Sequence, residues 1–251
     1  MFARESGAQQ IADGVVRLGT ELVNWYLVEQ DGKVTVVDAG QPAYRPQLEP
    51  GLRELGVQPA DVEAVVLTHA HADHIGVAEK LRKELDVPVL VHPDDERLAT
   101  TRKAFGKNEA SLLPYLRYGH AWKLLAHLTT TGGLPPKIER VETFADGQEL
   151  DVPGRPRVLH TPGHTMGHVA FHFPARGVLF AGDVLCNLNP LTGARGPQLM
   201  PRAFNLSSAK ILDSLTRIQD LDAGLLLFGH GEPWTEGPRA AVEHARRIGS
   251  T

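Results

Sequence analysis

The sequence has a single cysteine, Cys186, among its 251 residues. One cysteine excludes an internal disulfide and a cysteine-rich zinc site. Basic residues are not in excess either, because 26 lysines and arginines stand against 30 aspartates and glutamates, for a formal net charge of −4. Without a strong positive field, a general nucleic-acid-binding role is disfavoured.

Long apolar runs are also missing from the sequence. No stretch approaches the length that crosses a bilayer, and residues 1–14 lack the apolar segment of a secretory signal peptide. We therefore expect a cytoplasmic protein with no membrane partner. The remaining composition, 42% hydrophobic and 22% charged, is typical of a folded chain with a sizeable core.

Apolar runs and turn residues predict an alternation of strands and helices. A nearly continuous β-branched run at 62–68 is typical of a strand buried on both faces, and a helix at about 75–85 and a strand at 87–91 follow it. This order favours a crossover and a parallel or mixed sheet in an α/β fold. Other strands are expected at 14–19, 24–29, 33–38, 157–161, 168–173, 178–181 and 225–228, and helices at 46–55, 207–221 and 238–248.

Residues 94–137 interrupt this alternation. They carry leucines and the aromatic residues Tyr115, Tyr118 and Trp122 between polar residues. We interpret the segment as an insertion of about two helices. It is either an apolar lid, in which case these three aromatic residues bind substrate, or a helical pair that packs its own small core or forms a homodimer contact.

Histidine is the unusual residue, with 12 copies, and its densest cluster lies at 68–74, where the sequence reads THAHADH. The cluster supplies four ligand-type side chains: His69, His71, Asp73 and His74. Imidazoles and carboxylates are ligands that divalent metal ions prefer. Four such groups within six positions exceed what one tetrahedral ion needs from one loop, so the spacing indicates two neighbouring ions.

Three further ligand-type residues follow apolar strands, and glycine precedes each of them: His164, Asp183 and His230. Glycine permits the sharp turn that lifts a side chain off a strand end. Alone, such a histidine is usually an ordinary loop residue and such an aspartate a turn residue. Because one dense loop and three strand ends supply the same ligand chemistry, the joint pattern favours a metal centre at the carboxyl ends of the strands.

The chain resembles the metallo-β-lactamase-fold (MBL-fold) hydrolases through THAHADH at 68–74, TPGHTMGH at 161–168, FAGD at 180–183 and FGHG at 228–231, which occur in family order. The resemblance covers about residues 10–92 and 141–248. It implies one domain over 1–251, a four-layer αβ/βα sandwich with a helical insertion at about 94–137. The implied first metal site is His69, His71 and His164; the second is Asp73, His74 and His230, with Asp183 as the bridging carboxylate.

Within this superfamily, Asp183 and His74 match the glyoxalase II, lactonase and ribonuclease Z-like branch. The β-lactamases of the cysteine-ligand type have cysteine at the position of Asp183 and lack the fourth loop histidine. The residues after Asp183 do not match those by which glyoxalase II-like enzymes recognise glutathione, and no tyrosine follows Tyr118 to match the lactonases. The insertion is also not strongly basic, unlike a tRNA-gripping arm.

The resemblance predicts a hydrolase with two divalent ions, zinc or else iron or manganese. Such ions lower the pKa of a shared water, and the metal-bound hydroxide would cleave a carboxylic ester, lactone or thioester of a small molecule with an apolar acyl or aromatic part. Asp73 would also be catalytic, as an orienter of the hydroxide or a proton shuttle. His168 would either hydrogen-bond behind the ligands or stabilise its own turn.

Three other functions stay open on the sequence. One is a persulfide dioxygenase-like oxidoreductase that holds one iron through two histidines and an aspartate. Another is a phosphodiesterase or nuclease of the same fold. The third is a metal-binding protein without catalysis, which is disfavoured because structural zinc sites are closed and four-coordinate, whereas a carboxylate-bridged site is open.

Overall fold

Three β-sheets organise the computed structural model, which describes residues 8–103, 107–134 and 137–250. A seven-stranded sheet has the order β1-β2-β3-β4-β5-β6-β7, a four-stranded sheet the order β13-β10-β9-β8, and a hairpin pairs β11 with β12. The strands are β1 (Gln9–Ala12), β2 (Val15–Gly19), β3 (Asn24–Gln30), β4 (Lys33–Val37), β5 (Val62–Val66), β6 (Val89–Val91), β7 (Glu142–Thr143), β8 (Arg157–His160), β9 (Val169–Phe173), β10 (Val178–Gly182), β11 (Cys186–Leu188), β12 (Arg195–Gln198) and β13 (Leu225–Phe228).

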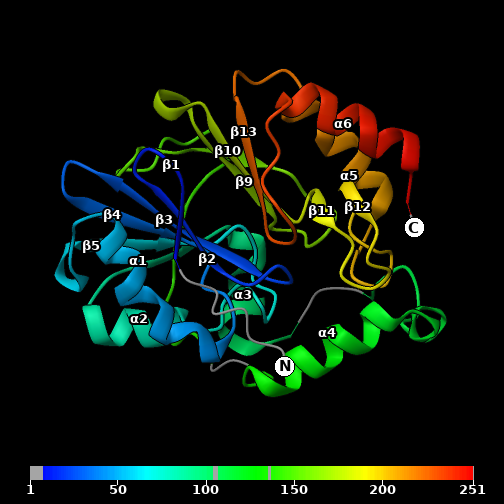
Figure 1. The fold of residues 1–251 in the computed structure, drawn as a ribbon, viewed down its shortest axis with the longest axis horizontal. Coiled ribbons are helices and arrows are strands. Elements are labelled where there is room, and N and C mark those ends of the chain that lie inside the picture. The colour runs from blue at the N-terminus through cyan, green and yellow to red at the C-terminus, as the bar shows by residue number, and fades with distance from the viewer. Residues whose placement is uncertain (1–7, 104–106, 135–136, 251) are drawn as a thin grey trace.

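Helices lie on the outer faces of both large sheets (Figure 1). The α-helices are α1 (Leu48–Glu54), α2 (Ala78–Leu85), α3 (Pro93–Thr101), α4 (Gly119–Thr130), α5 (Ser208–Ser214) and α6 (Gly237–Ile248). Short 3₁₀ turns are η1 (Pro42–Gln47), η2 (Pro59–Asp61), η3 (Leu113–Arg117), η4 (Pro174–Arg176) and η5 (Leu215–Arg217). Among the described residues, no helix has the length and apolar character needed to span a membrane.

Alternating side chains explain the layering. In β3, Trp25 and Leu27 pack in the core under α1 and α2, whereas Tyr26 and Val28 point into the core between the two large sheets. Phe180 of β10 enters this central core from the opposite side and meets Tyr26 edge to face, with 5.1 Å between ring centroids. Since α5 and α6 cover the other face of the second sheet, the predicted four-layer αβ/βα sandwich is confirmed.

Two hydrogen-bonding side chains of β3 join the sheets at the site edge. The Asn24 amide donates through Nδ2 to the carbonyl oxygens of Phe228, at 3.0 Å, and of Gly231, at 2.7 Å. The Tyr26 hydroxyl donates to the same Phe228 oxygen at 2.6 Å. These bonds fix the end of β13 against the first sheet.

The predicted crossover is confirmed, because β5 pairs parallel with both β4 and β6. The helix expected from about residue 75 begins only at Ala78. The preceding turn is bonded instead to the loop after β4, through Gly76 N to Gly40 O at 2.8 Å and Val77 N to Ala39 O at 3.0 Å. The helix expected at 207–221 is also shorter, because α5 ends at Ser214 and continues as the 3₁₀ turn η5.

The segment expected as an insertion divides into two parts, and its residues 104–106 and 135–136 lie outside the described residues. The first part, α3, belongs to the sandwich, because its Ala99 packs in the core under the first sheet. The second part, η3 with α4, lies apart from both large sheets (Figure 1). Ala121 and Leu124 of α4 pack there against Leu191 and Ala203 in a separate small core.

Candidate metal centre

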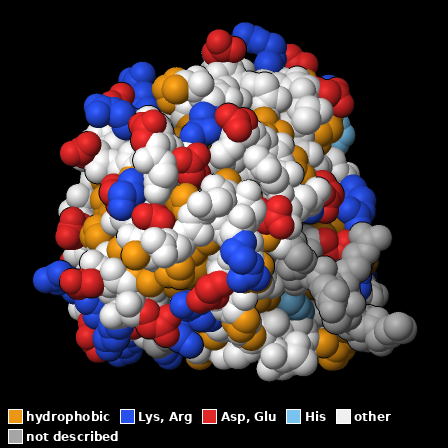
Figure 2. Space-filling model, turned by 60° about the vertical axis from the view of Figure 1, so that its left-hand side comes forward, with side chains coloured by type: hydrophobic (Ala, Val, Ile, Leu, Met, Phe, Trp, Pro, Cys, Tyr) orange, Lys and Arg blue, Asp and Glu red, His pale blue; other side chains and the backbone are white. Residues whose placement is uncertain are grey.

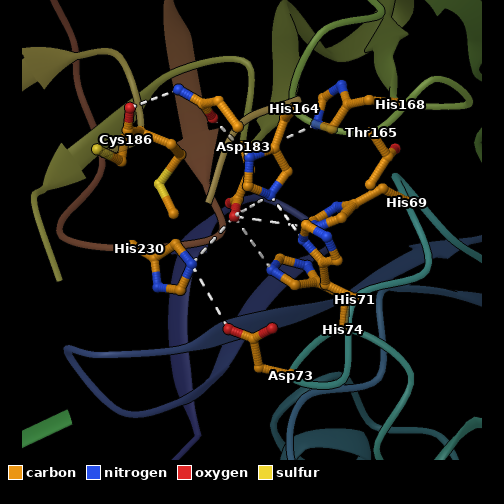
Figure 3. Close-up of polar contacts among 12 residues, drawn as sticks. His69, His71, Asp73, His74, His164, Thr165, His168, Asp183, Cys186 and His230 are labelled. Atoms are coloured by element: carbon orange, nitrogen blue, oxygen red, sulfur yellow. Dashed lines mark hydrogen bonds and ion pairs between the residues drawn. The ribbon is translucent and has the colours of Figure 1, made fainter. Parts of the chain in front are cut away.

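The predicted ligands meet where strands of both large sheets end (Figure 3). The 68–74 loop follows β5, whereas His164, Asp183 and His230 follow β8, β10 and β13. Among the described residues, four groups have ligand atoms that all lie within 4.8 Å of one another, and three of them consist of the predicted ligands: His69, His71 and His164; His69, His74 and Asp183; and Asp73, His74 and His230. The fold therefore brings the seven residues together from four strand ends.

The carboxylate of Asp183 lies at the middle of the cluster. Its Oδ2 atom is 3.1 Å from His230 Nε2, 3.4 Å from His164 Nε2, 3.6 Å from His74 Nε2 and 3.9 Å from His69 Nε2. The side chain is buried, with 2% exposed. One carboxylate oxygen thus faces imidazoles of both expected metal sites (Figure 3).

Hydrogen bonds on the far side of the rings orient four of these imidazoles. Each donates from Nδ1 to an oxygen and so presents the lone pair of Nε2 to the centre. The pairs are His69 with Thr68 Oγ1 at 3.1 Å, His74 with Asp38 Oδ2 at 2.8 Å, His164 with Asn205 Oδ1 at 2.9 Å, and His230 with the Leu22 carbonyl.

Three buried atoms at the centre have no hydrogen-bond partner among the residues that the structure describes: His69 Nε2, His74 Nε2 and Asp183 Oδ1. An unpaired buried polar atom costs about 1–3 kcal/mol, so three in one place need an explanation. Imidazole nitrogens and a carboxylate oxygen are ligand atoms for divalent ions such as zinc. The donor set and its orphaned atoms therefore fit bound divalent ions.

Electrostatics divide the imidazoles into two kinds. Burial, together with the neighbouring imidazoles, lowers the pKa of His69 and of His164 well below the ordinary value, which favours the neutral form that binds metal. Burial opposes protonation of His74 and His230, but nearby carboxylates outweigh it and raise the pKa of both above the ordinary value: Asp183 for both rings, with Asp38 for His74 and Asp73 for His230. The Asp183 carboxylate therefore favours a positive charge, on a ring or on a bound cation, at the position that His74 and His230 face.

The glycines before the ligands act in different ways. Gly163 has a φ of +136°, a conformation that other residues rarely adopt. Gly229 is needed for space instead, because a Cβ atom there would overlap Asp183 Oδ1 and lie 2.6 Å from His74 Cε1. Any side chain at position 229 would displace the two ligand groups.

Asp38, at the end of β4, is a site residue that the sequence reasoning missed. Its Oδ1 accepts from the Thr68 amide at 2.8 Å, and its Oδ2 accepts from His74 Nδ1 at 2.8 Å. A signal was present, because Asp38 follows an apolar strand as Asp183 does. Asn205, the partner of His164, stands in an irregular loop and had no such signal.

His168 lies behind Asp183 rather than in the ligand set. Its Nε2 accepts from the Asp183 backbone amide at 2.9 Å, and its Nδ1 donates to Thr161 Oγ1 at 2.8 Å. Burial lowers the pKa of His168 to about 3, so the ring is neutral and can accept this bond. The contact fixes the backbone that carries the central carboxylate.

The aromatic residues of the insertion lie elsewhere. Tyr115 packs against the small core of α4. The Tyr118 hydroxyl accepts from Arg117 at 2.7 Å, and the Trp122 indole donates to the Leu116 carbonyl at 2.8 Å. These contacts, among the residues the structure describes, do not join Tyr118 or Trp122 to the ligand cluster.

Comparisons with known proteins identify the family of this chain. A profile of the metallo-beta-lactamase superfamily matches residues 18–230. A Bacillus subtilis (strain 168) protein named a probable metallo-hydrolase is 31% identical over 230 residues, which are 84% of this chain and 67% of the relative. A hydroxyacylglutathione hydrolase of Xanthomonas campestris pv. campestris (strain B100) is 32% identical over 207 residues, which are 82% of this chain but only 59% of that enzyme.

A solved structure gives the same result in three dimensions. The metallo-beta-lactamase family protein of Thermus thermophilus superposes with a TM-score of 0.65 at 31% identity, over 95% of this chain and 79% of that one. The profile match alone covers most of the chain, including every predicted ligand. The chain therefore belongs to the metallo-β-lactamase superfamily of metal-dependent hydrolases.

Proposed function

We propose that this protein is a dinuclear zinc hydrolase that cleaves a carboxylic ester, lactone or thioester. The observation that carries the proposal is the position of Asp183 Oδ2, 3.4 Å from His164 of one ligand group and 3.1 Å from His230 of the other. A carboxylate between two such groups can ligate two ions. Divalent ions held there would act as a Lewis acid and would lower the pKa of a bound water to about 7.

Each ligand residue has an assigned place in the proposal. His69, His71 and His164 would hold the first ion; Asp73, His74 and His230 would hold the second; and Asp183 would join them. Asp73 differs from Asp183 in being partly accessible, with 21% of its side chain exposed, and its Oδ2 lies 3.6 Å from His230 Nε2. We therefore assign Asp73 the task of orienting the attacking water and accepting its proton.

The insertion is proposed as a fixed wall of the substrate site. His127 of α4 hydrogen-bonds through Nε2 to the Tyr44 hydroxyl at 2.6 Å, and Lys123 of α4 pairs with Glu21 at 3.0 Å. Burial raises the pKa of the Tyr44 phenol, and the Asp73 carboxylate raises it further. Tyr44 therefore lies close to the ligand loop. Helix α4 is therefore held beside the metal centre by polar contacts at two points.

The exposed side of the insertion bears on the substrate. Trp122 is 55% exposed and Leu125 is 46% exposed, so α4 leaves apolar surface uncovered. We propose a small-molecule substrate with an apolar acyl or aromatic part. The relative named a hydroxyacylglutathione hydrolase favours a thioester within this class.

The charge distribution supports a small molecule rather than a nucleic acid. On the face shown in Figure 2, acidic and basic side chains are interspersed, without a field of one sign. The formal net charge of −4 agrees with this.

A homodimer contact is the other use proposed for the exposed apolar residues of the insertion. The mass of the protein in solution would decide between a homodimer contact and a substrate-binding surface.

The test is metal content together with activity. Purified protein should contain about two ions per chain, mostly zinc, and should hydrolyse members of an ester, lactone and thioester panel in a chelator-sensitive manner. Asp183→Ala should lower metal content and activity together, whereas full metal and full activity would overturn the bridging role. About one iron per chain, with oxygen uptake on persulfides, would replace the proposal by the oxidoreductase alternative.

A further inference from the structure

Asp95, near the start of α3, carries a carboxylate that the proposed chemistry does not use. It is buried, with 2% of the residue exposed, and accepts three hydrogen bonds. Its Oδ2 accepts from the Ala70 amide at 3.0 Å and from Thr165 Oγ1 at 2.7 Å, and its Oδ1 accepts from the Gly167 amide at 2.9 Å. Burying a carboxylate is costly unless its oxygens are paired, so these three donors hold it in place.

The three donors come from the two loops that carry the first ligand group. Ala70 stands between His69 and His71, and Thr165 directly follows His164. These loops are far apart in the sequence, since His71 and His164 are separated by 93 positions, yet their ring nitrogens lie 2.8 Å apart. Asp95 is therefore a point at which both ligand loops are bonded to one rigid helix.

We infer that Asp95 is a positioning residue that sets the spacing of the His69–His71 loop and the His164 loop, and thereby the affinity of this three-imidazole group for a divalent ion. The inference rests on the ligand assignment made in the proposed function but not on any substrate. Residues that hold ligands in place typically contribute 10–100-fold to metal affinity.

A second observation supports a specific clamp. A Cβ atom added to Gly167 would lie 2.6 Å from Asp95 N and 2.8 Å from Asp95 Cγ. Glycine at this position therefore allows the loop to approach the carboxylate closely. Asparagine cannot replace Asp95 fully. The Ala70 amide donates to Oδ2 and the Gly167 amide to Oδ1, so the NH₂ group of an asparagine would face one of these two N–H donors.

A backbone hydrogen bond also connects the His69–His71 loop with the segment that follows the His164 loop. The Val169 amide donates to the Thr68 carbonyl at 2.8 Å, and this backbone bond joins the two loops at their bases. We therefore expect an Asp95→Asn chain to fold. Its loops would keep their connection to the sheets, but the spacing of the ligand rings would be less fixed.

The experiment measures Zn²⁺ affinity by competition with a chromophoric chelator at neutral pH, with no substrate present. Asp95→Asn should weaken the tightest zinc site by about 10–100-fold. The matched control is Glu96→Gln, which removes one negative charge from an exposed position in the same helical turn and should stay within about twofold of the wild type. Zinc affinity of Asp95→Asn within about twofold of the wild type would overturn the inference.

Two further measurements separate positioning from a purely structural role. In the Co²⁺-loaded protein, Asp95→Asn should change the visible absorption bands, which report ligand geometry. Gly167→Ala keeps the Asp95 carboxylate and should reproduce the loss of zinc affinity. In the Asp95→Asn/Gly167→Ala double variant, the fold loss of zinc affinity should be smaller than the product of the two single losses, because both changes disturb the same contact. If Asp95→Asn fails to fold, Gly167→Ala decides alone, and normal zinc affinity in that variant overturns the inference.

The outcomes also distinguish this inference from the proposed function. If the wild type binds zinc and Asp95→Asn binds it equally well, the clamp is refuted and the hydrolase proposal stands. If the wild type fails to bind zinc under the same conditions, the dinuclear proposal itself is refuted.

Discussion

Replacing Glu79 by glutamine is expected to destabilise the protein by about 2 kcal/mol at pH 7. The side chain lies on α2 with 6% exposed, and Arg82 donates to its two oxygens at 2.8 and 2.9 Å. Lys83 Nζ lies 3.0 Å from it, and the Glu139 amide donates to it at 3.2 Å. The Arg82 hydrogen bonds, with smaller contributions from Lys83 and Glu139, lower the pKa of Glu79 to about 2.

The magnitude follows from linkage between protonation and folding. A pKa lowered from 4.5 to about 2 corresponds to about 3 kcal/mol of stabilisation of the ionised form. We reduce this to about 2 kcal/mol, because the Lys83 side chain is 53% exposed and solvent weakens its interaction with Glu79. Since the folded pKa lies below the unfolded one, the stabilisation is complete above about pH 4.5 and is lost as the pH falls through about 2.

Urea unfolding of the metal-free protein measures the effect. With a slope of about 3 kcal/mol per M, the midpoint at pH 7 should fall by about 0.7 M in Glu79→Gln. The control is Glu84→Gln on the same helix, because Glu84 is 39% exposed and its pairs with Arg45 and Lys80 should contribute less than about 1 kcal/mol. Equal midpoints in the two variants at pH 7, or a Glu79→Gln difference that does not shrink toward pH 3, would refute the reasoning.

Three further predictions concern the site. Chelator treatment should lower the Tm and abolish hydrolysis, and added zinc should restore both; an unchanged Tm would contradict metal binding at the orphaned atoms. Gly229→Ala should lower metal content at least as much as loss of Asp183, because its Cβ would lie 2.6 Å from His74 Cε1; metal analysis showing full occupancy would contradict this. Tyr44→Phe removes the 2.6 Å bond to His127, so amide exchange in α4 should accelerate and KM should rise with unchanged metal content, whereas unaltered exchange would show that α4 is held by other contacts.

Local patterns in the sequence were sufficient to predict that the candidate ligands meet at one place, because they follow apolar strands. Once β5, β8, β10 and β13 are placed in sheets, their carboxyl ends carry His69, His164, Asp183 and His230 to one edge without further information. The alternation of strands and helices predicted an α/β fold with a crossover, whereas the four layers followed from the resemblance to the MBL-fold hydrolases.

Residues that act through tertiary contacts were not predictable in this way. Asn205 reaches His164 across 41 positions, and Asp95 reaches Thr165 across 70. No periodicity marks such a pair, because the partner is defined only after the sheets pack. The β11–β12 hairpin was missed for a local reason: its strands have three and four residues, and β12 contains Gly196 and Pro197, so no alternation is visible.

The hydrogen bonds from Asn24 to the Phe228 and Gly231 carbonyls can form only late in synthesis of the chain. Asn24 and Gly231 are 207 positions apart, so at about 5–20 residues per second a ribosome needs about 10 to 40 s to pass from one to the other. During that interval the first ligand loop has emerged, but His164, Asp183 and His230 follow it only in stages. We therefore expect metal loading to be a late event, and a nascent chain halted before residue 230 should bind zinc far more weakly than the finished protein.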